Sequence, residues 1–176
     1  MADAHNAARV LLLDVDLPAD SRLPGDGAAA LQQALDFGRA AVAAELLGIA
    51  DEVFERTLDY LKQRQQFGRL IGEFQALQHR AATLYVDIEL ARAALAKALH
   101  ALDTAPAQAA EAVAVAKAKC GSAATLAVQE GVQMHGGMGM TDQLDFGLFM
   151  KRARVLQELY GDTGLQMDRL ARMRGY

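Results

Sequence analysis

The fold class is decided by the stretch Ala109-Ala-Glu-Ala-Val-Ala-Val-Ala-Lys117, together with Arg39-Ala-Ala-Val-Ala-Ala-Glu45. Alanine-rich runs of this kind form helices readily and strands poorly. The 176 residues are 52% hydrophobic and 23% charged with 3 prolines, which is the composition of one globular domain with a substantial core. The sequence therefore predicts an all-α protein.

Apolar residues spaced three and four positions apart predict where the helices lie. The first helix is expected over 28–64 and the second over 74–102, after the break at Phe67-Gly68. The third is expected to start at Pro106, because proline suits the first turn of a helix. A fourth helix capped by Thr141 and a short terminal helix over 166–173 then complete an up-down four-helix bundle.

The third predicted helix carries small side chains on its apolar face, which permits close helix packing. They are Val113, Ala116, Cys120, Ala124, Ala127 and Gly131. Cys120 is the single cysteine of the chain, so no internal disulfide forms, and no histidine pairs with it. A small buried thiol is therefore favoured over a reactive nucleophile.

One segment departs from the helical pattern, because Leu13, Val15 and Leu17 alternate with aspartates over 10–17. This alternation predicts an extended strand, yet no other segment is typical of a strand that would pair with it. A partner chain or an upstream sheet domain would supply the neighbour, or the segment is an arm on the surface. We expect residues 1–27 to be the end of a β-domain with its linker, and 28–176 to be the helical bundle.

Charge and composition exclude several classes of function. The 18 basic and 22 acidic residues give a net charge of −4, which argues against nucleic acid and anionic membranes as partners. No apolar run reaches the roughly 18 residues of a membrane span, and no signal peptide is expected at Met1, so a cytoplasmic location is predicted. No histidine stands in a Glu-x-x-His pair, so no metal site is expected.

Two short motifs suggest a binding site, although each is weak alone. Arg64-Gln-Gln-Phe-Gly-Arg69 combines guanidinium groups that grip phosphate with a glycine that lets a backbone approach a ligand, but a charged helix end has the same composition. Gln133-Met-His-Gly-Gly-Met-Gly139 leaves backbone N–H groups open to a phosphate or a polar ligand edge, but a plain helix-breaking loop would look alike.

Taken together, Gln133–Gly139 and the longer run Arg64-Gln-Gln-Phe-Gly-Arg-Leu-Ile-Gly-Glu-Phe-Gln-Ala-Leu-Gln-His-Arg80 resemble the two signature stretches of the acyl-CoA dehydrogenase family. The resemblance covers about 28–174, which corresponds to the C-terminal helical domain of that family. The segment over 10–17 is similar to the last strand of the β-domain that precedes it.

The resemblance implies a flavoprotein oxidoreductase of fatty acid metabolism that uses FAD to form a trans-2-enoyl product from an acyl-CoA. It further implies homodimers or homotetramers, with hetero-oligomers of same-family subunits as an alternative. The residues that it assigns to FAD are Arg64, Gln66, Phe67, Gln75, Gln133, Gly136, Gly137, Thr163 and Gln166. Arg39 matches an arginine near the acyl-CoA substrate, although an ion-paired helix residue is an equal alternative.

The chain departs from the family where the catalytic glutamate is expected. The family shows Tyr-Glu-Gly-Thr, and this chain has Tyr160-Gly-Asp-Thr-Gly-Leu-Gln166. Gly161 takes the place of the base in an ungapped match, and Asp162 takes it after a one-residue insertion. Asp162 is thus a candidate base or a helix cap, and an unlike subunit is a third source of the base. We expect the chain alone to be inactive; the alternative is a non-catalytic helical oligomerisation module.

Overall fold

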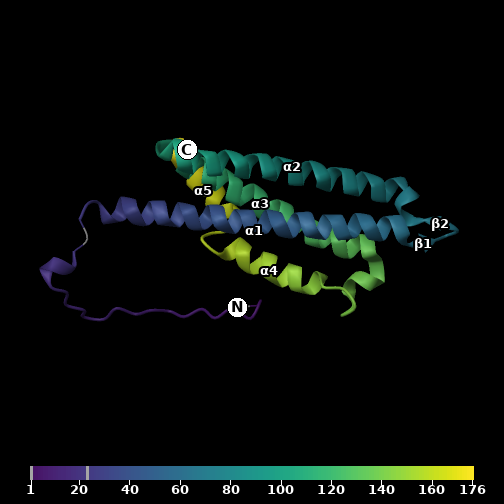
Figure 1. Ribbon diagram of the computed structural model, residues 1–176, viewed down its shortest axis with the longest axis horizontal. Helices are drawn as coiled ribbons and strands as arrows, with labels where there is room; N and C mark the ends of the chain where they lie inside the picture. Colours follow the sequence, from purple (N-terminus) through teal and green to yellow (C-terminus); the bar gives the residue numbers. More distant parts are fainter. Residues whose placement is uncertain (1, 23) are drawn as a thin grey trace.

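The computed structural model describes residues 2–22 and 24–176 and contains five α-helices within them (Figure 1). They are α1 (Gly27–Gln63), α2 (Gln75–Thr104), α3 (Pro106–His135), α4 (Phe146–Glu158) and α5 (Thr163–Met173). The first four form the expected up-down bundle and α5 is the short terminal helix, so the predicted all-α fold is confirmed. No described helix has both the length and the apolar content that a membrane crossing requires.

Local chemistry explains where the helices begin. The Asp26 carboxylate accepts hydrogen bonds from the backbone N–H groups of Ala28 and Ala29, at 3.0 and 3.2 Å, and so caps α1. The predicted cap at Thr141 is wrong, because α4 begins only at Phe146. The Thr141 hydroxyl instead donates to the carbonyl of Met138 at 2.8 Å, so it closes the preceding 3₁₀ turn.

Helix α3 lies at the centre of the bundle and contacts each of the other four helices (Figure 1). Its predicted small face is buried, with Ala116, Cys120, Ala124 and Ala127 all fully inaccessible. Small side chains let α1 and α2 approach α3 closely, and the larger residues of those two helices fill the space between them.

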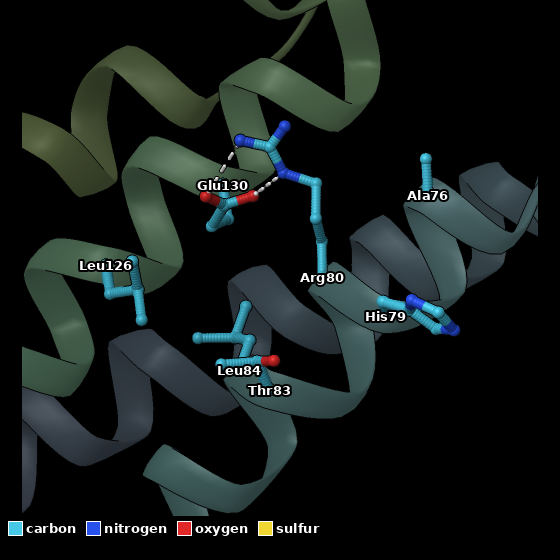
Figure 2. A pocket seen from close by; sticks show the side chains of 7 residues that line it. All are labelled: Ala76, His79, Arg80, Thr83, Leu84, Leu126 and Glu130. Atoms are coloured by element: carbon cyan, nitrogen blue, oxygen red, sulfur yellow. Dashed lines mark hydrogen bonds and ion pairs between the residues drawn. The ribbon is translucent and has the colours of Figure 1, made fainter.

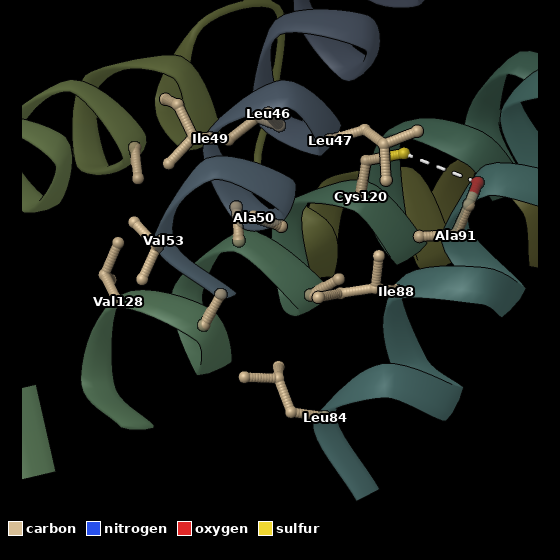
Figure 3. Close-up of a cluster of buried hydrophobic side chains, with 14 of the residues drawn as sticks. Leu46, Leu47, Ile49, Ala50, Val53, Leu84, Ile88, Ala91, Cys120 and Val128 are labelled. Carbon is tan, nitrogen blue, oxygen red and sulfur yellow. Dashed lines mark hydrogen bonds between the residues drawn. The ribbon is translucent and has the colours of Figure 1, made fainter. Parts of the chain in front are cut away.

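The core lies between α1, α2 and α3, as Figure 3 shows, with Leu46 and Val53 facing Leu84 and Ile88. The Cys120 sulfur lies in this core, 3.7 Å from the carbonyl oxygen of Ala91. Burial raises the pKa of the Cys120 thiol to about 12, which keeps it protonated at neutral pH. The prediction of a small buried thiol is therefore confirmed.

The predicted strand over 10–17 is not formed. Its apolar side chains are exposed, from 56% at Val15 to 80% at Val10, and Asp14 has a φ of +47° that interrupts the extended run. A strand needs a neighbour for its backbone groups, and the described residues supply none here. The sheet that they do contain is the hairpin of β1 (Gln65–Gln66) and β2 (Arg69–Leu70).

Two glycines offer a matched test of the close packing around α3. A Cβ added at Gly131 of α3 would lie 2.8 Å from Val53 Cγ1 and 3.0 Å from Phe146 Cε1, whereas nothing lies within 4 Å at Gly48 of α1. We expect Gly131→Ala to lower the free energy of unfolding by about 1–3 kcal/mol. Gly48→Ala should raise it by roughly 0.5–1 kcal/mol through helix propensity. Urea unfolding of both variants checks this, and equal effects would contradict the packing described.

Candidate functional site

The residues assigned to a site from the sequence fall into two separate places. Seven lie at one end of the bundle, where α1 ends, α2 begins and α3 ends (Figure 1). We call this place the hairpin end and define it as residues 64–75 and 133–137: Arg64, Gln66, Phe67, Gln75, Gln133, Gly136 and Gly137. The other four, Arg39, Asp162, Thr163 and Gln166, lie around the α4–α5 turn, defined as residues 159–162.

The hairpin presents one aromatic ring to solvent. Gln65 pairs with Leu70 and Gln66 with Arg69, which leaves Phe67 and Gly68 as a two-residue turn with φ values of +55° and +80°. Positive φ at both central residues is the geometry that suits the twist of a tight hairpin, but it strains a bulky residue. Phe67 is nevertheless 89% exposed, so the strain is not offset by burial of its ring.

Polar groups surround this ring. Arg64 and Gln66 are exposed, and within the described residues the Arg64 side chain forms no ion pair. Phe74 stands edge-on to Phe67 with ring centroids 6.1 Å apart, and the Arg69 guanidinium lies 4.1 Å above the Phe74 ring. Gln75 is exposed at the first turn of α2. The hairpin therefore combines a free cation, an amide and an accessible aromatic face.

The glycine loop that follows α3 has an open backbone. Gly136 has a φ of +60°, and a Cβ added at Gly136 or Gly137 would meet nothing within 4 Å. Gly139 differs, because a Cβ there would lie 2.6 Å from the carbonyl oxygen of Val132. The first two glycines thus leave room for a ligand, whereas the third is needed for packing.

His135 fastens this loop to the bundle. Its ring stacks on Tyr60 of α1 with centroids 4.2 Å apart, and Nδ1 lies 2.7 Å from the carbonyl oxygen of Gly131. Burial lowers the pKa of His135 below its ordinary value, despite this hydrogen bond, so the ring is neutral at pH 7. A neutral ring donates from Nδ1 to that carbonyl, which fixes its tautomer. A cavity of about 300 Å³ lies beside it, lined in part by Phe146.

At the α4–α5 turn, Asp162 caps α5. Its Oδ1 accepts a hydrogen bond from the backbone N–H of Leu165 at 2.8 Å, and the terminal helix therefore starts at Thr163 rather than at 166. Gly161 before it has a φ of +99°, and a Cβ there would overlap Leu165 Cδ2 and lie 2.8 Å from Gln166 Nε2. A side chain at position 161 would therefore be strained by this φ and would displace the side chains of Leu165 and Gln166.

Arg39 is held by a buried carboxylate. Its Nη1 lies 2.8 Å from Asp36 Oδ1, and its Nε donates to the carbonyl oxygen of Tyr160 at 3.2 Å. Arg169 also contacts Asp36, with Nη1 at 2.8 Å from Oδ1. Burial alone would raise the pKa of Asp36, but the bonds from Arg169, Gln32 and Arg39 outweigh it and lower that pKa. Arg39 is therefore ion-paired and also tied to the α4–α5 turn.

Sequence reasoning missed two buried charges beside this turn, Asp36 and Lys117. The i, i+3 spacing of Asp36 and Arg39 is a signal for an ion pair on one helix face. Lys117 stands four residues after Val113 and three before Cys120, so the helical period already placed it on the buried face of α3. Burial of both follows from position rather than from residue type, because charged residues are seldom predicted to be inside.

A groove of about 500 Å³ lies between α2 and α3 next to the hairpin end, since its lining begins at Ala76 (Figure 2). Arg80 reaches across it and donates to both carboxylate oxygens of Glu130, at 2.7 and 3.2 Å. Leu84 and Leu126 line the groove beneath this pair. The arginine charge is already neutralised there, and none of the residues assigned to a site from the sequence lines the groove.

Comparison with known proteins identifies the family of this chain. A family model described as the acyl-CoA dehydrogenase C-terminal domain matches residues 25–174. Over 118 residues the chain is 44% identical to acyl-CoA dehydrogenase IpdE2 of Mycobacterium tuberculosis, which covers 67% of this chain and 35% of that protein.

Solved structures share the fold. Butyryl-CoA dehydrogenase from Megasphaera elsdenii is 30% identical with a TM-score of 0.82, over 91% of this chain and 42% of its own. The ChsE4-ChsE5 complex from Mycobacterium tuberculosis is 27% identical with a TM-score of 0.74, over 78% of this chain and 37% of its own. The chain spans less than half the length of these relatives. Because the family model for the C-terminal domain matches residues 25–174, this chain belongs to the acyl-CoA dehydrogenase family.

Proposed function

We propose that this chain is the C-terminal part of a flavin-dependent acyl-CoA dehydrogenase, which forms an α,β-double bond in an acyl-CoA thioester. The observation that carries the proposal is that the two signature stretches lie at the same end of the bundle. They are separated by more than fifty residues in sequence, yet the antiparallel course of α2 and α3 returns the chain to the same end of the bundle (Figure 1).

The groups displayed at the hairpin end support a role in FAD binding. Arg64 offers an exposed guanidinium to a diphosphate, and Phe67 offers an aromatic face to a flat ring. Amides such as that of Gln133 match the hydrogen-bonding edge of adenine, and the open backbone at Gly136 and Gly137 admits a ligand without a clash. FAD, when bound, supplies the oxidation of the substrate, and these residues bind and orient it.

Thr163 and Gln166 remain separate candidates for FAD contact. Gln166 is fully buried, and its Nε2 donates to the carbonyl oxygen of Tyr160 at 2.9 Å. Thr163 donates to the carbonyl oxygen of Ala118 at 3.4 Å. The Gln166 amide nitrogen and the Thr163 hydroxyl are thus bonded within the bundle, whereas the buried Gln166 Oε1 has no hydrogen-bond partner among the described residues.

Most of the cofactor and thioester pocket would have to come from other segments. The chain spans 35% of IpdE2 and 42% of the butyryl-CoA dehydrogenase chain. We therefore propose that it is inactive by itself and works in a homodimer, a homotetramer or a hetero-oligomer of same-family subunits. Its exposed apolar segment at Val10 to Leu17 supports this, because those side chains would be covered in a larger assembly.

In the hetero-oligomer, we propose, the base for α-proton removal comes from the unlike partner chain. Gly161 has no side chain that could take a proton, and Asp162 Oδ1 already accepts a hydrogen bond from Leu165 N as a helix cap. The ChsE4-ChsE5 structure is a complex of two different chains, which supports such an arrangement by analogy. The competing assignment keeps Asp162 as the base, with Arg39 beside the acyl-CoA.

The same turn supports a second candidate function, a helical oligomerisation subunit that binds no FAD. Its supporting observation is that Gly161 carries no carboxylate and that the neighbouring Asp162 caps α5 through its Oδ1. The two functions differ in what happens at the hairpin end. A non-catalytic module would be insensitive to changes at Arg64, whereas a flavoprotein subunit would not.

Arg64→Ala is the test of FAD contact. In an assembly that carries FAD, loss of one charge-assisted contact to a diphosphate should weaken FAD binding about 10- to 100-fold, as measured by fluorescence titration of the apo-assembly. Arg154→Ala is the matched control, because Arg154 is an exposed arginine on α4 that pairs with Glu158 at 2.8 Å. Equal FAD affinity in both variants would favour the oligomerisation module.

Asp162→Asn separates the capping role from the catalytic one. Asparagine caps helices about as well as aspartate, so an assembly with this variant should keep its stability. Asparagine cannot take a proton, so turnover should also be kept if the base comes from the partner chain. Asp162→Ala should cost roughly 1 kcal/mol in the free energy of unfolding through the lost cap. Turnover is measured as enoyl-CoA formation, and its loss in Asp162→Asn would instead assign the base to Asp162.

A further inference from the structure

Lys117 is a buried cation that the proposed function has not used. It is 1% exposed on the central helix α3, and among the described residues no carboxylate lies within ion-pair distance of its Nζ. Its Nζ donates instead to two backbone carbonyls, that of Gln157 at 3.0 Å and that of Gly161 at 3.1 Å. Burial lowers the pKa of the Lys117 ammonium to about 8, although the charge of nearby Asp162 opposes this.

Burial of an ammonium group in this place is costly, because few partners replace its water. A methionine of similar length would fill the same space without that cost. The two carbonyls that Lys117 binds belong to the end of α4 and to the α4–α5 turn. The lysine therefore joins α3 to the segment that leads into α5.

Two further side chains donate to the same turn. Arg39 of α1 donates to the carbonyl oxygen of Tyr160, and Gln166 of α5 donates to the carbonyl oxygens of Tyr160 and Gly161 at 2.9 and 3.4 Å. Tyr160 and Gly161 are consecutive residues with φ values of +59° and +99°. Left-handed backbone at a tyrosine is strained, so it persists only where surrounding contacts hold it.

We propose that Lys117 is the positioning residue of the α4–α5 turn. Its two hydrogen bonds fix where α4 ends and where the carbonyl of Gly161 points, and so fix the start of α5 and the direction of the Asp162 side chain. The relevance of this role to catalysis rests on the proposed function, because the acyl-CoA dehydrogenase family places its catalytic base in this turn. The geometry of the turn itself is independent of any flavin.

The test is amide hydrogen exchange, measured by NMR on the full chain without cofactor. The reporters are the N–H groups of Gly161, Leu165 and Gln166, which bond to Glu158 O, Asp162 Oδ1 and Asp162 O at 3.0, 2.8 and 3.0 Å. In Lys117→Met we expect these three amides to exchange at least about tenfold faster, while amides in the middle of α2 keep their wild-type rates.

Ile88→Val is the matched control, because it trims a buried side chain of α2 that is 1% exposed and lies outside the turn. Any increase in exchange rates in this variant should reflect its lower global stability and should not be larger at the turn than elsewhere. Unchanged exchange at the three reporters in Lys117→Met would overturn the proposal. Acceleration spread evenly over the chain, as a purely structural role predicts, would overturn it as well.

A measurement on the wild-type chain covers the case in which Lys117→Met does not fold. The Lys117 ammonium protons should give a slowly exchanging signal with nuclear Overhauser effects to residues 157 and 161, and absence of that signal would contradict the proposal. Neither readout involves FAD or turnover. A failed flavin assignment at the hairpin end would therefore leave this result standing, and the reverse holds too.

Discussion

Close packing against the small side chains of α3 sets the geometry of the whole chain. Ala116, Ala124 and Ala127 are fully buried, and Gly131 leaves no space for even a methyl group between Val53 and Phe146. Helices that pack at this distance along their length are fixed in register and direction. The end of α1, the start of α2 and the end of α3 therefore lie at the same end of the bundle. This arrangement positions the hairpin and the glycine loop there.

The two places that this packing creates have different chemistry. The hairpin end displays a strained, exposed Phe67 and an open backbone at Gly136, which is the character of a surface that receives a ligand. The α4–α5 turn differs, because Arg39 and Lys117 donate hydrogen bonds to its carbonyl oxygens from within the bundle. One place is prepared for a molecule from outside, and the other is held by the protein itself.

Much of the fold could be predicted from the sequence because helical periodicity is a local property. The start of α3 at Pro106 and its buried small face follow directly from residue type and spacing. The strand over 10–17 could not be predicted correctly, because its alternation describes a strand only when a neighbour is present. Thr141 failed as a cap because its hydroxyl bonds within the preceding turn to Met138 O.

The candidate site could be predicted from the sequence only through the resemblance of two motifs. Only the fold shows that both motifs lie at the same end of the bundle. The long-range polar contacts around the α4–α5 turn could not be predicted, because Lys117 lies far in sequence from Gly161 and Asp36 lies far from Arg169. Their partners are a backbone carbonyl at Gly161 and a guanidinium at Arg169, and backbone acceptors leave no trace in a sequence. Long-range polar networks of this kind are set by packing first and by residue type second.

We propose that the hairpin end receives the dinucleotide. Titration of the isotope-labelled chain with millimolar ADP, followed by NMR, tests it most directly, since this probe carries the diphosphate and adenine without the flavin. We expect chemical-shift changes confined to residues 64–67 and 133–137, with the α4–α5 turn unaffected. Shifts centred on that turn, or no shifts at either stretch, would contradict it.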